Sequence, residues 1–122
     1  MSITLTALAT LGIGGVTVES DANAELYYFE LSFPSSVRLF YGFGTTVGSV
    51  FTPGTQLPKV IVNLSLSTGA WTSSNGLSGT VSGAGFTAVQ NDFLALANVA
   101  ETFAVNNSIV AGTQVPWTSS VY

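Results

Sequence analysis

Hydrophobic and polar residues alternate with a period of two along the first two thirds of the chain, a pattern typical of half-buried strands. In residues 3–8 (ITLTAL) isoleucine, leucine and alanine alternate with threonine, and residues 16–20 (VTVES) resume the alternation. The glycines of GIGG at 12–15 separate the two runs. Because glycines between alternating runs favour a turn, we expect an amino-terminal hairpin.

Longer runs predict the central strands. Residues 25–33 (ELYYFELSF) and 37–43 (VRLFYGF) are rich in aromatic residues and are joined by a short Pro-Ser-Ser connection, which favours a second hairpin. Residues 59–68 (KVIVNLSLST) alternate most regularly, with valine and leucine on one face and polar residues on the other. Between these runs, Thr52-Pro53-Gly54-Thr55 suits a type II turn. After a turn at Ser73-Ser74-Asn75-Gly76, residues 77–81 predict a short strand.

The period changes near residue 89. Apolar residues fall at 89, 93, 96, 97, 100, 103 and 104, the spacing of one stripe along an amphipathic helix, and we predict a helix over residues 87–105. Thr87 and Gln90 have the spacing of a capping box at its start. Residues 108–122, broken by Gly112 and Pro116, predict a short strand and an arm.

Together these elements predict one β-rich domain over residues 1–122, of mainly β (α+β) class. We expect an antiparallel sandwich or a single curved sheet, with one carboxyl-terminal amphipathic helix packed on a face of the sheet.

Charged residues are scarce: the chain has two basic and six acidic residues, 7% of the total, whereas a typical soluble domain has about 25%. A surface with so few charges repels copies of itself poorly. The composition therefore favours a chain whose surface is largely buried against neighbours, although an extracellular domain coated with hydroxyl groups is an alternative.

The same composition bears on chemistry. Arg38 and Lys59 are the only cations, so nucleic-acid binding, which relies on clustered basic residues, is not expected. The chain has no histidine and no cysteine, which removes the usual ligands of zinc, haem and copper, and we expect no metal or cofactor. Asp92 and Glu101 point to opposite sides of the predicted helix, and Lys59 is a poor candidate base, so we expect no enzymatic activity. No segment resembles a membrane-spanning helix, and no membrane partner is expected.

Two tryptophans are candidate functional residues. Trp71 in GAWTSS and Trp117 in VPWTSS lie in polar, turn-like surroundings. Such rings suit stacking on sugars or filling a pocket on an adjacent subunit, and the structural alternative is that each covers the edge of its own core. We name Trp71, Trp117, Tyr122, Arg38 and Lys59 as candidate interface residues.

The order of elements, an amino-terminal hairpin (ITLTAL, VTVES), central strands (ELYYFELSF, VRLFYGF, KVIVNLSLST) and a late helix (TAVQNDFLALANVAETFAV), resembles that of the small coat proteins of single-stranded RNA bacteriophages. It looks equally like the decoration or cement proteins of tailed phages. The resemblance implies a non-enzymatic virion subunit, located in the virion, whose partners are copies of itself and a major capsid protein. RNA-phage coats present basic residues to the genome, and here only Arg38 and Lys59 are available, which favours a role at the outer surface.

Two other classes remain open. An extracellular or cell-surface glycan-binding module or adhesin would use Trp71 and Trp117 to stack on sugars. A pilus or filament subunit would form open linear polymers where a capsid protein forms closed shells.

Overall fold

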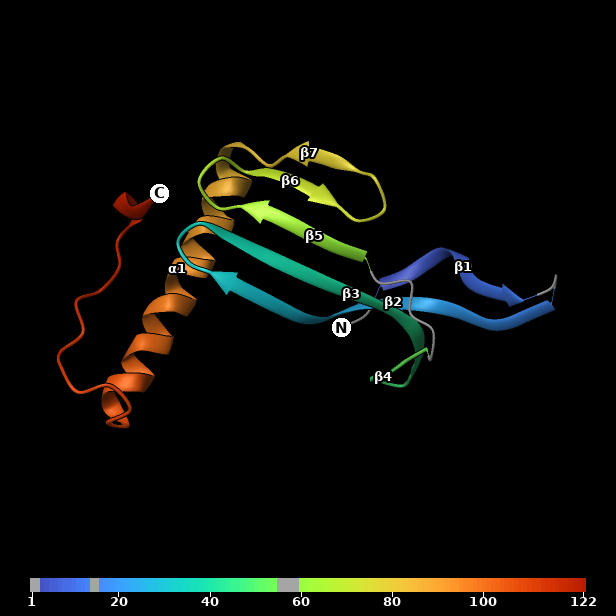
Figure 1. The fold of residues 1–122 in the computed structure, drawn as a ribbon, viewed down its shortest axis with the longest axis horizontal. Coiled ribbons are helices and arrows are strands. Elements are labelled where there is room, and N and C mark those ends of the chain that lie inside the picture. The colour runs from blue at the N-terminus through green and yellow to red at the C-terminus, as the bar shows by residue number, and fades with distance from the viewer. Residues whose placement is uncertain (1–2, 14–15, 55–59) are drawn as a thin grey trace.

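The computed structural model describes the backbone of residues 3–13, 16–54 and 60–122, and the side chains of residues 4–5, 23–54 and 60–122. Within these ranges the chain forms one antiparallel sheet followed by one long helix (Figure 1). The strands are β1 (Ile3–Ile13), β2 (Val16–Ser32), β3 (Ser36–Val47), β4 (Val50–Pro53), β5 (Val60–Ser65), β6 (Ala70–Ser73) and β7 (Ser78–Thr80). Their hydrogen-bonded order is β1-β2-β3-β5-β6-β7, and β4 pairs with the end of β3. The predicted class, mainly β with one carboxyl-terminal helix, is confirmed, and the sheet is single and curved.

Several strand boundaries differ from the sequence prediction. The predicted strands 16–20 and 25–33 are one strand, β2, because the polar residues between them stay paired: Asp21 lies opposite Ala9 of β1, and Asn23 lies opposite Gly44 of β3. Residues 70–73, expected to precede a loop, form β6. The predicted strand over 59–68 is shorter, since β5 ends at Ser65, and its first residue, Lys59, lies outside the described residues.

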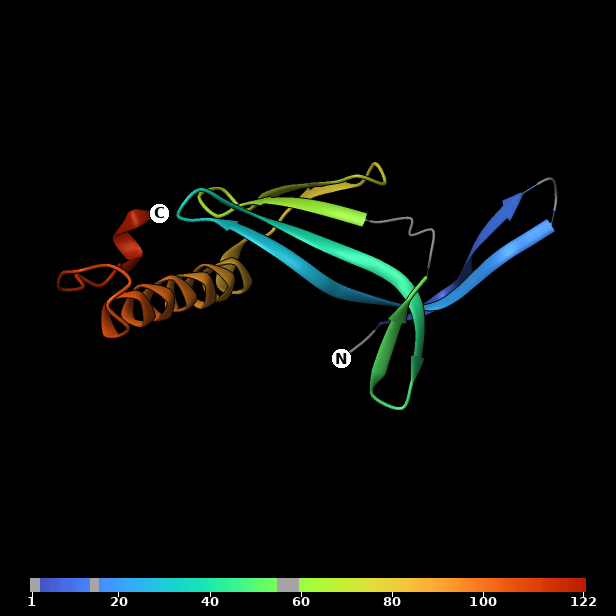
Figure 2. The same ribbon diagram turned by 60° about the horizontal axis from the view of Figure 1, so that its bottom comes forward.

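The sheet carries two projecting hairpins. Figure 2 shows β1 and the first part of β2 running away from the other strands, and the β3–β4 hairpin leaving the sheet where β3 bends. Thr46 N donates to Asn23 Oδ1 at 2.9 Å, and Gly54 N donates to Phe43 O at 2.9 Å. In the predicted type II turn at 52–55, residues 52 and 53 therefore belong to β4 and Gly54 follows the strand. Thr55 lies outside the described residues.

The helix α1 (Gly83–Asn106) begins four residues before the predicted start at residue 87 and ends one residue after the predicted end at 105. Ser82 occupies the N-cap position, and the predicted capping box is wrong. Thr87 Oγ1 donates to Gly83 O at 3.3 Å, and Gln90 Nε2 donates to Leu66 O at 2.8 Å, so the Gln90 side chain holds the helix to the turn after β5. The glycines of the first turn hide the true start, because glycine is a weak helix former.

The core lies where the amino-terminal half of α1 covers one end of the sheet. Val37, Leu64 and Leu66 are buried there, and Val89 and Phe93 of α1 pack against them. The carboxyl-terminal half of α1 runs beyond the sheet (Figures 1 and 2). In the part of the chain that the structure describes, no helix has a stretch apolar enough to cross a bilayer.

The carboxyl-terminal arm, residues 107–122, runs back from the end of α1 towards the β2–β3 turn (Figure 1). The predicted short strand does not form, because residues 108–122, all of them described, hold one 3-10 turn, η1 (Ser119–Val121), and irregular backbone. The arm bonds to α1 instead of to a sheet edge: the backbone N–H and C=O of Trp117 pair with the Asn98 side chain, and the Gln114 side chain donates to the Asn98 carbonyl oxygen.

We predict that Gly44→Ala destabilises the fold. A Cβ at residue 44 would stand 2.1 Å from Thr52 O, and the contact is with backbone, so β4 would have to move away from β3. The expected loss in the free energy of unfolding is about 1–3 kcal/mol, typical of overpacking, measured by urea denaturation. Gly85→Ala in α1 is the control, because nothing lies within 4 Å of its Cβ, and it should leave stability equal or slightly higher. Equal effects of the two substitutions would contradict the β3–β4 packing.

Candidate interaction surface

One face of the sheet is apolar and only partly covered. Strand register aligns Leu31, Val37, Leu64 and Trp71 in one row across β2, β3, β5 and β6. In this row Val37 has no exposed surface, because α1 lies over it. The next row, Phe29, Leu39 and Val62, is less covered, and Phe29 remains 44% exposed although its ring meets Phe93 of α1 at a centroid distance of 6.4 Å. The apolar face therefore continues past the edge of the helix.

An open hollow lies on this face beside the helix. Its volume is about 270 Å³, and its lining consists of apolar side chains: Leu39, Val62, Leu64, Trp71 and Val81. A hollow without polar groups cannot hydrogen-bond a ligand, so it suits an apolar side chain.

The helix has a second apolar side that is exposed. Leu96, Val99 and Phe103 recur at intervals of three and four residues, which places them on one side of α1. Val99 is 64% exposed and Phe103 is 60% exposed. The predicted single stripe is wrong here: Phe93 and Ala97 face the molecule, whereas Leu96 and Phe103 face away. We call Leu96, Val99 and Phe103 the outer stripe.

The carboxyl-terminal arm is fastened to α1 by one asparagine. Asn98 Oδ1 accepts from Trp117 N at 2.8 Å, and Asn98 Nδ2 donates to Trp117 O at 3.1 Å, so a single side chain pairs with both backbone groups of one residue. Gln114 Nε2 donates to the Asn98 carbonyl oxygen at 2.9 Å. The arm is thus a defined part of the fold.

Trp117 is half-buried in a socket between the arm, α1 and the β2–β3 turn. Its ring meets Phe33 edge to face at 5.0 Å, and its Nε1 donates to Glu101 Oε1. Tyr122 meets the same Phe33 ring at 5.9 Å, and its hydroxyl donates to Gln90 O at 3.0 Å. Burial raises the pKa of Tyr122 above its ordinary value of 10.0. Both predicted interface residues therefore contact their own chain.

Trp71 is also partly buried within its own chain. Its indole lies against Gly79 of β7, where a Cβ would stand 2.9 Å from Trp71 Cε2, and it lines the apolar hollow. Trp71 and Trp117 sit in separate places, one on the sheet and one on the arm, so they do not form a common stacking platform.

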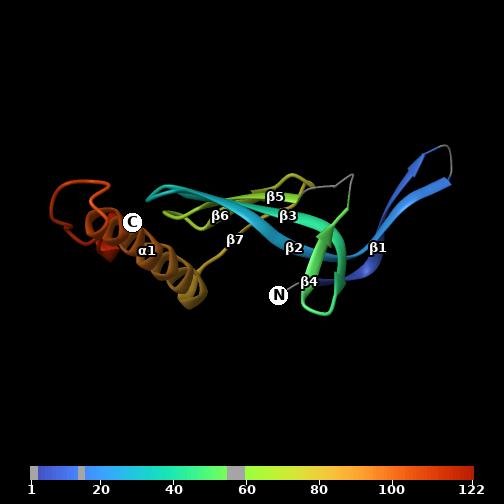
Figure 3. The ribbon, with the colours of Figure 1, turned by 90° about the horizontal axis from the view of Figure 1, so that it is seen from below.

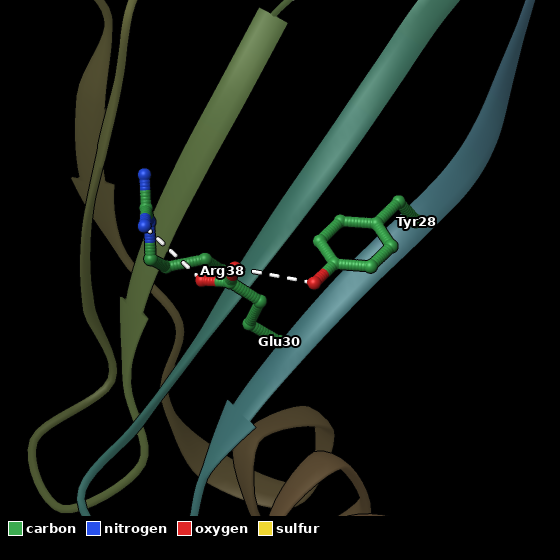
Figure 4. Close-up of polar contacts among 3 residues, drawn as sticks. All are labelled: Tyr28, Glu30 and Arg38. Carbon is green, nitrogen blue, oxygen red and sulfur yellow. Dashed lines mark hydrogen bonds and ion pairs between the residues drawn. The ribbon is translucent and has the colours of Figure 1, made fainter.

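The opposite face of the sheet carries Arg38, the basic residue whose side chain the structure describes. Arg38 Nη1 donates to Glu30 Oε2 at 3.1 Å, and Tyr28 OH donates to Glu30 Oε1 at 3.2 Å (Figure 4). The guanidinium also lies 5.2 Å from the centre of the Phe40 ring. The Glu30 carboxylate raises the pKa of the exposed Tyr28 above 10.0. Arg38 is thus paired with an acid on its own sheet, and Lys59, the other predicted interface cation, lies outside the described residues.

Polar groups gather in one further hollow of about 480 Å³, whose lining includes Ser36, Asn63, Ser65, Trp71 and Thr72. Among the described residues, acidic side chains form no cluster of three that could hold a metal ion.

No family model, curated protein or solved structure matches this chain.

Sequence reasoning missed the socket of Trp117 and the outer stripe. The sequence did not mark Asn98 as a functional residue, and nothing in it linked position 98 to position 117. The outer stripe had a signal: the apolar residues of α1 spread over more than one side, which is unusual for a helix that lies on a sheet with its other side in water.

We predict that Asn98→Ala loosens the arm. The substitution leaves the partly buried N–H and C=O of Trp117 without partners, which costs about 1–3 kcal/mol. Tryptophan fluorescence should shift towards the exposed form at lower urea concentration. Asn91→Ala is the matched control, because Asn91 is exposed on the same helix. Equal behaviour of the two variants would show that the Asn98 pairing contributes nothing.

Proposed function

We propose that this chain is a non-enzymatic structural subunit of a virion, a coat or capsid-decorating protein that associates in many copies through its apolar surfaces. One observation carries the proposal: a single chain exposes both an uncovered apolar sheet face and an apolar outer stripe on α1. The two surfaces suit each other, because a row of side chains on a helix can fill the hollow and cover Phe29 on a second copy.

The exposed area supports this proposal. A compact monomer of 12.6 kDa exposes about 6,200 Å², whereas this chain exposes 7842 Å². The excess, about 1,600 Å² per chain, is about twice the area of roughly 800 Å² that each partner buries in an interface of standard size. Much of it is apolar, as the exposed leucines, valines and aromatic residues indicate. Large contiguous apolar patches are rare on monomeric proteins.

Charge supports the same proposal. Phe29, Leu39 and Val62 and the three residues of the outer stripe are uncharged, and the nearest ionised group on that side of α1 is the exposed Asp92, one turn before Leu96. Association through Val99 and Phe103 would leave Asp92 at the margin of the contact, where it can stay hydrated. The described cation, Arg38, lies on the opposite face and is paired with Glu30. Association through the apolar face therefore costs little electrostatic desolvation.

Glycan binding is the second candidate, and the hollow with Ser36, Asn63, Ser65 and Thr72 favours it. Its hydroxyl and amide groups suit a neutral sugar, whereas the Trp71 ring lies on the other face of the sheet, in the row of Val37 and Leu64. If this hollow binds sugar, titration with a panel of saccharides changes tryptophan fluorescence in a saturable way, and Asn63→Ala abolishes the change. The packing of Trp117 against Phe33 makes it unsuitable as a second stacking ring.

We predict that Phe103→Glu prevents association. A carboxylate in the outer stripe stays hydrated in the monomer but would lose water at a helix–sheet contact, which is costly for an unpaired charge. Sedimentation velocity should show large assemblies for the unaltered chain and small species for the variant. Asn91→Glu adds the same charge on a polar side of α1 and should leave assembly intact.

Electron microscopy of the assembled chain completes the test. Closed shells support a coat role, and small oligomers that bind to a purified capsid support a decorating role. Open filaments favour the filament alternative over the virion proposal. An unaltered chain that stays monomeric at high concentration contradicts the proposal.

A further inference from the structure

The β6–β7 turn holds a group that can react with its own backbone. We propose that Asn75 is a self-modification site, at which the Gly76 nitrogen attacks the Asn75 side-chain amide while the Ser73 hydroxyl activates that amide. The inference is independent of the proposed function.

The geometry of the turn brings the three residues together. Ser73, Ser74, Asn75 and Gly76 form a turn in which Gly76 N donates to Ser73 O at 3.1 Å, and Gly76 then takes a positive φ of 88°. The single proton of the Ser73 hydroxyl has two acceptors within reach, Leu77 O at 3.2 Å and Asn75 Oδ1, and the contact with Asn75 is the shorter. Asn75 is exposed, and apart from residues 75 and 77 nothing lies within 4 Å of the place where a Cβ of residue 76 would stand, so the turn is open around Gly76.

The reaction needs only water as a co-reactant. The Gly76 amide nitrogen gives its proton to base and forms a bond to Asn75 Cγ, and negative charge develops on Oδ1. The bond from Cγ to the side-chain nitrogen then breaks, ammonia leaves, and a five-membered imide remains. Water opens the imide at one of its two carbonyl groups, which leaves either an aspartate or an isoaspartate at position 75.

Ser73 contributes where charge develops. A hydroxyl that already donates to Oδ1 stabilises the tetrahedral intermediate as an oxyanion donor does. In a water-excluded enzyme site one such donor is worth about a hundredfold or more, but this turn is exposed and water can replace the hydroxyl, so we expect a severalfold effect. The Ser73 Oγ atom also accepts from Leu77 N at 3.1 Å, and this bond holds the hydroxyl in place.

The product changes the electrostatics of this part of the chain. Residues 60–91 contain no ionisable side chain, and the modification places the first carboxylate there, next to the edge strand β7. The net charge, −4 for the unmodified chain, becomes one unit more negative when Asn75 is converted.

The test incubates the purified full chain at neutral and mildly alkaline pH and follows each asparagine by peptide mass mapping and isoelectric focusing. We expect Asn75 to convert severalfold faster than the other six asparagines, with a rate that rises with hydroxide concentration and with isoaspartate among the products. The internal controls are Asn23, Asn63, Asn91, Asn98, Asn106 and Asn107. Asn75→Gln, which keeps the amide but needs a larger ring, should stop the acidic shift. Conversion of Asn75 no faster than that of the other asparagines overturns the proposal.

Variants of Ser73 test the activation. Ser73→Ala should slow conversion severalfold, and Ser73→Thr, which keeps a hydroxyl, should restore it. If Ser73 only braced the turn, its removal would free the Gly76 amide and speed the reaction. An unchanged or faster rate in Ser73→Ala, with circular dichroism showing an intact sheet, therefore overturns the role of Ser73.

Discussion

The fold depends on the burial of one row of side chains under the first half of α1. Val37, Leu64 and Leu66 form the buried centre of this contact, and the Gln90 side chain fixes the helix to the turn beside it. A fully buried valine or leucine contributes about 1.5–3 kcal/mol, so these three form a thin core for the part of the chain whose side chains are described. Association that covers the next row would add to stability, because a partner that binds only the folded chain favours it by mass action.

The arm explains why that next row stays open. If the second half of α1 lay on its own sheet, it would cover Phe29 and the hollow, and the chain would be closed. The backbone of Trp117 is instead hydrogen-bonded to Asn98, and its ring packs on Phe33, so the arm connects the helix to the β2–β3 turn. The helix therefore crosses the end of the sheet (Figure 3). The outer stripe is thereby presented to the surroundings.

Sequence periodicity predicted the element types well where one face of an element is buried. The alternation in residues 60–66 placed Leu64 and Leu66 inside, as found. It failed where the pairing partner decides the structure: residues 21–24 look like a break but are held between β1 and β3, and the register shift at Tyr27 moves its ring out of line with Phe29. The position of the arm could not be predicted from the sequence. Asn98 lies 19 residues from Trp117, and its side chain bonds to the backbone of Trp117, which carries no sequence signal.

The two faces of the sheet differ in the charged residues that they carry. The apolar face has no ionised group in the rows that pass beyond α1, while the opposite face holds Glu30 and Arg38 as a neutral pair. On the described part of that opposite face Glu30 is compensated by Arg38, whereas Glu25, which lies opposite Gly42, forms no ion pair. In the association that we propose, the apolar rows would determine where two copies meet, because only there does contact remove a large hydrophobic area from water.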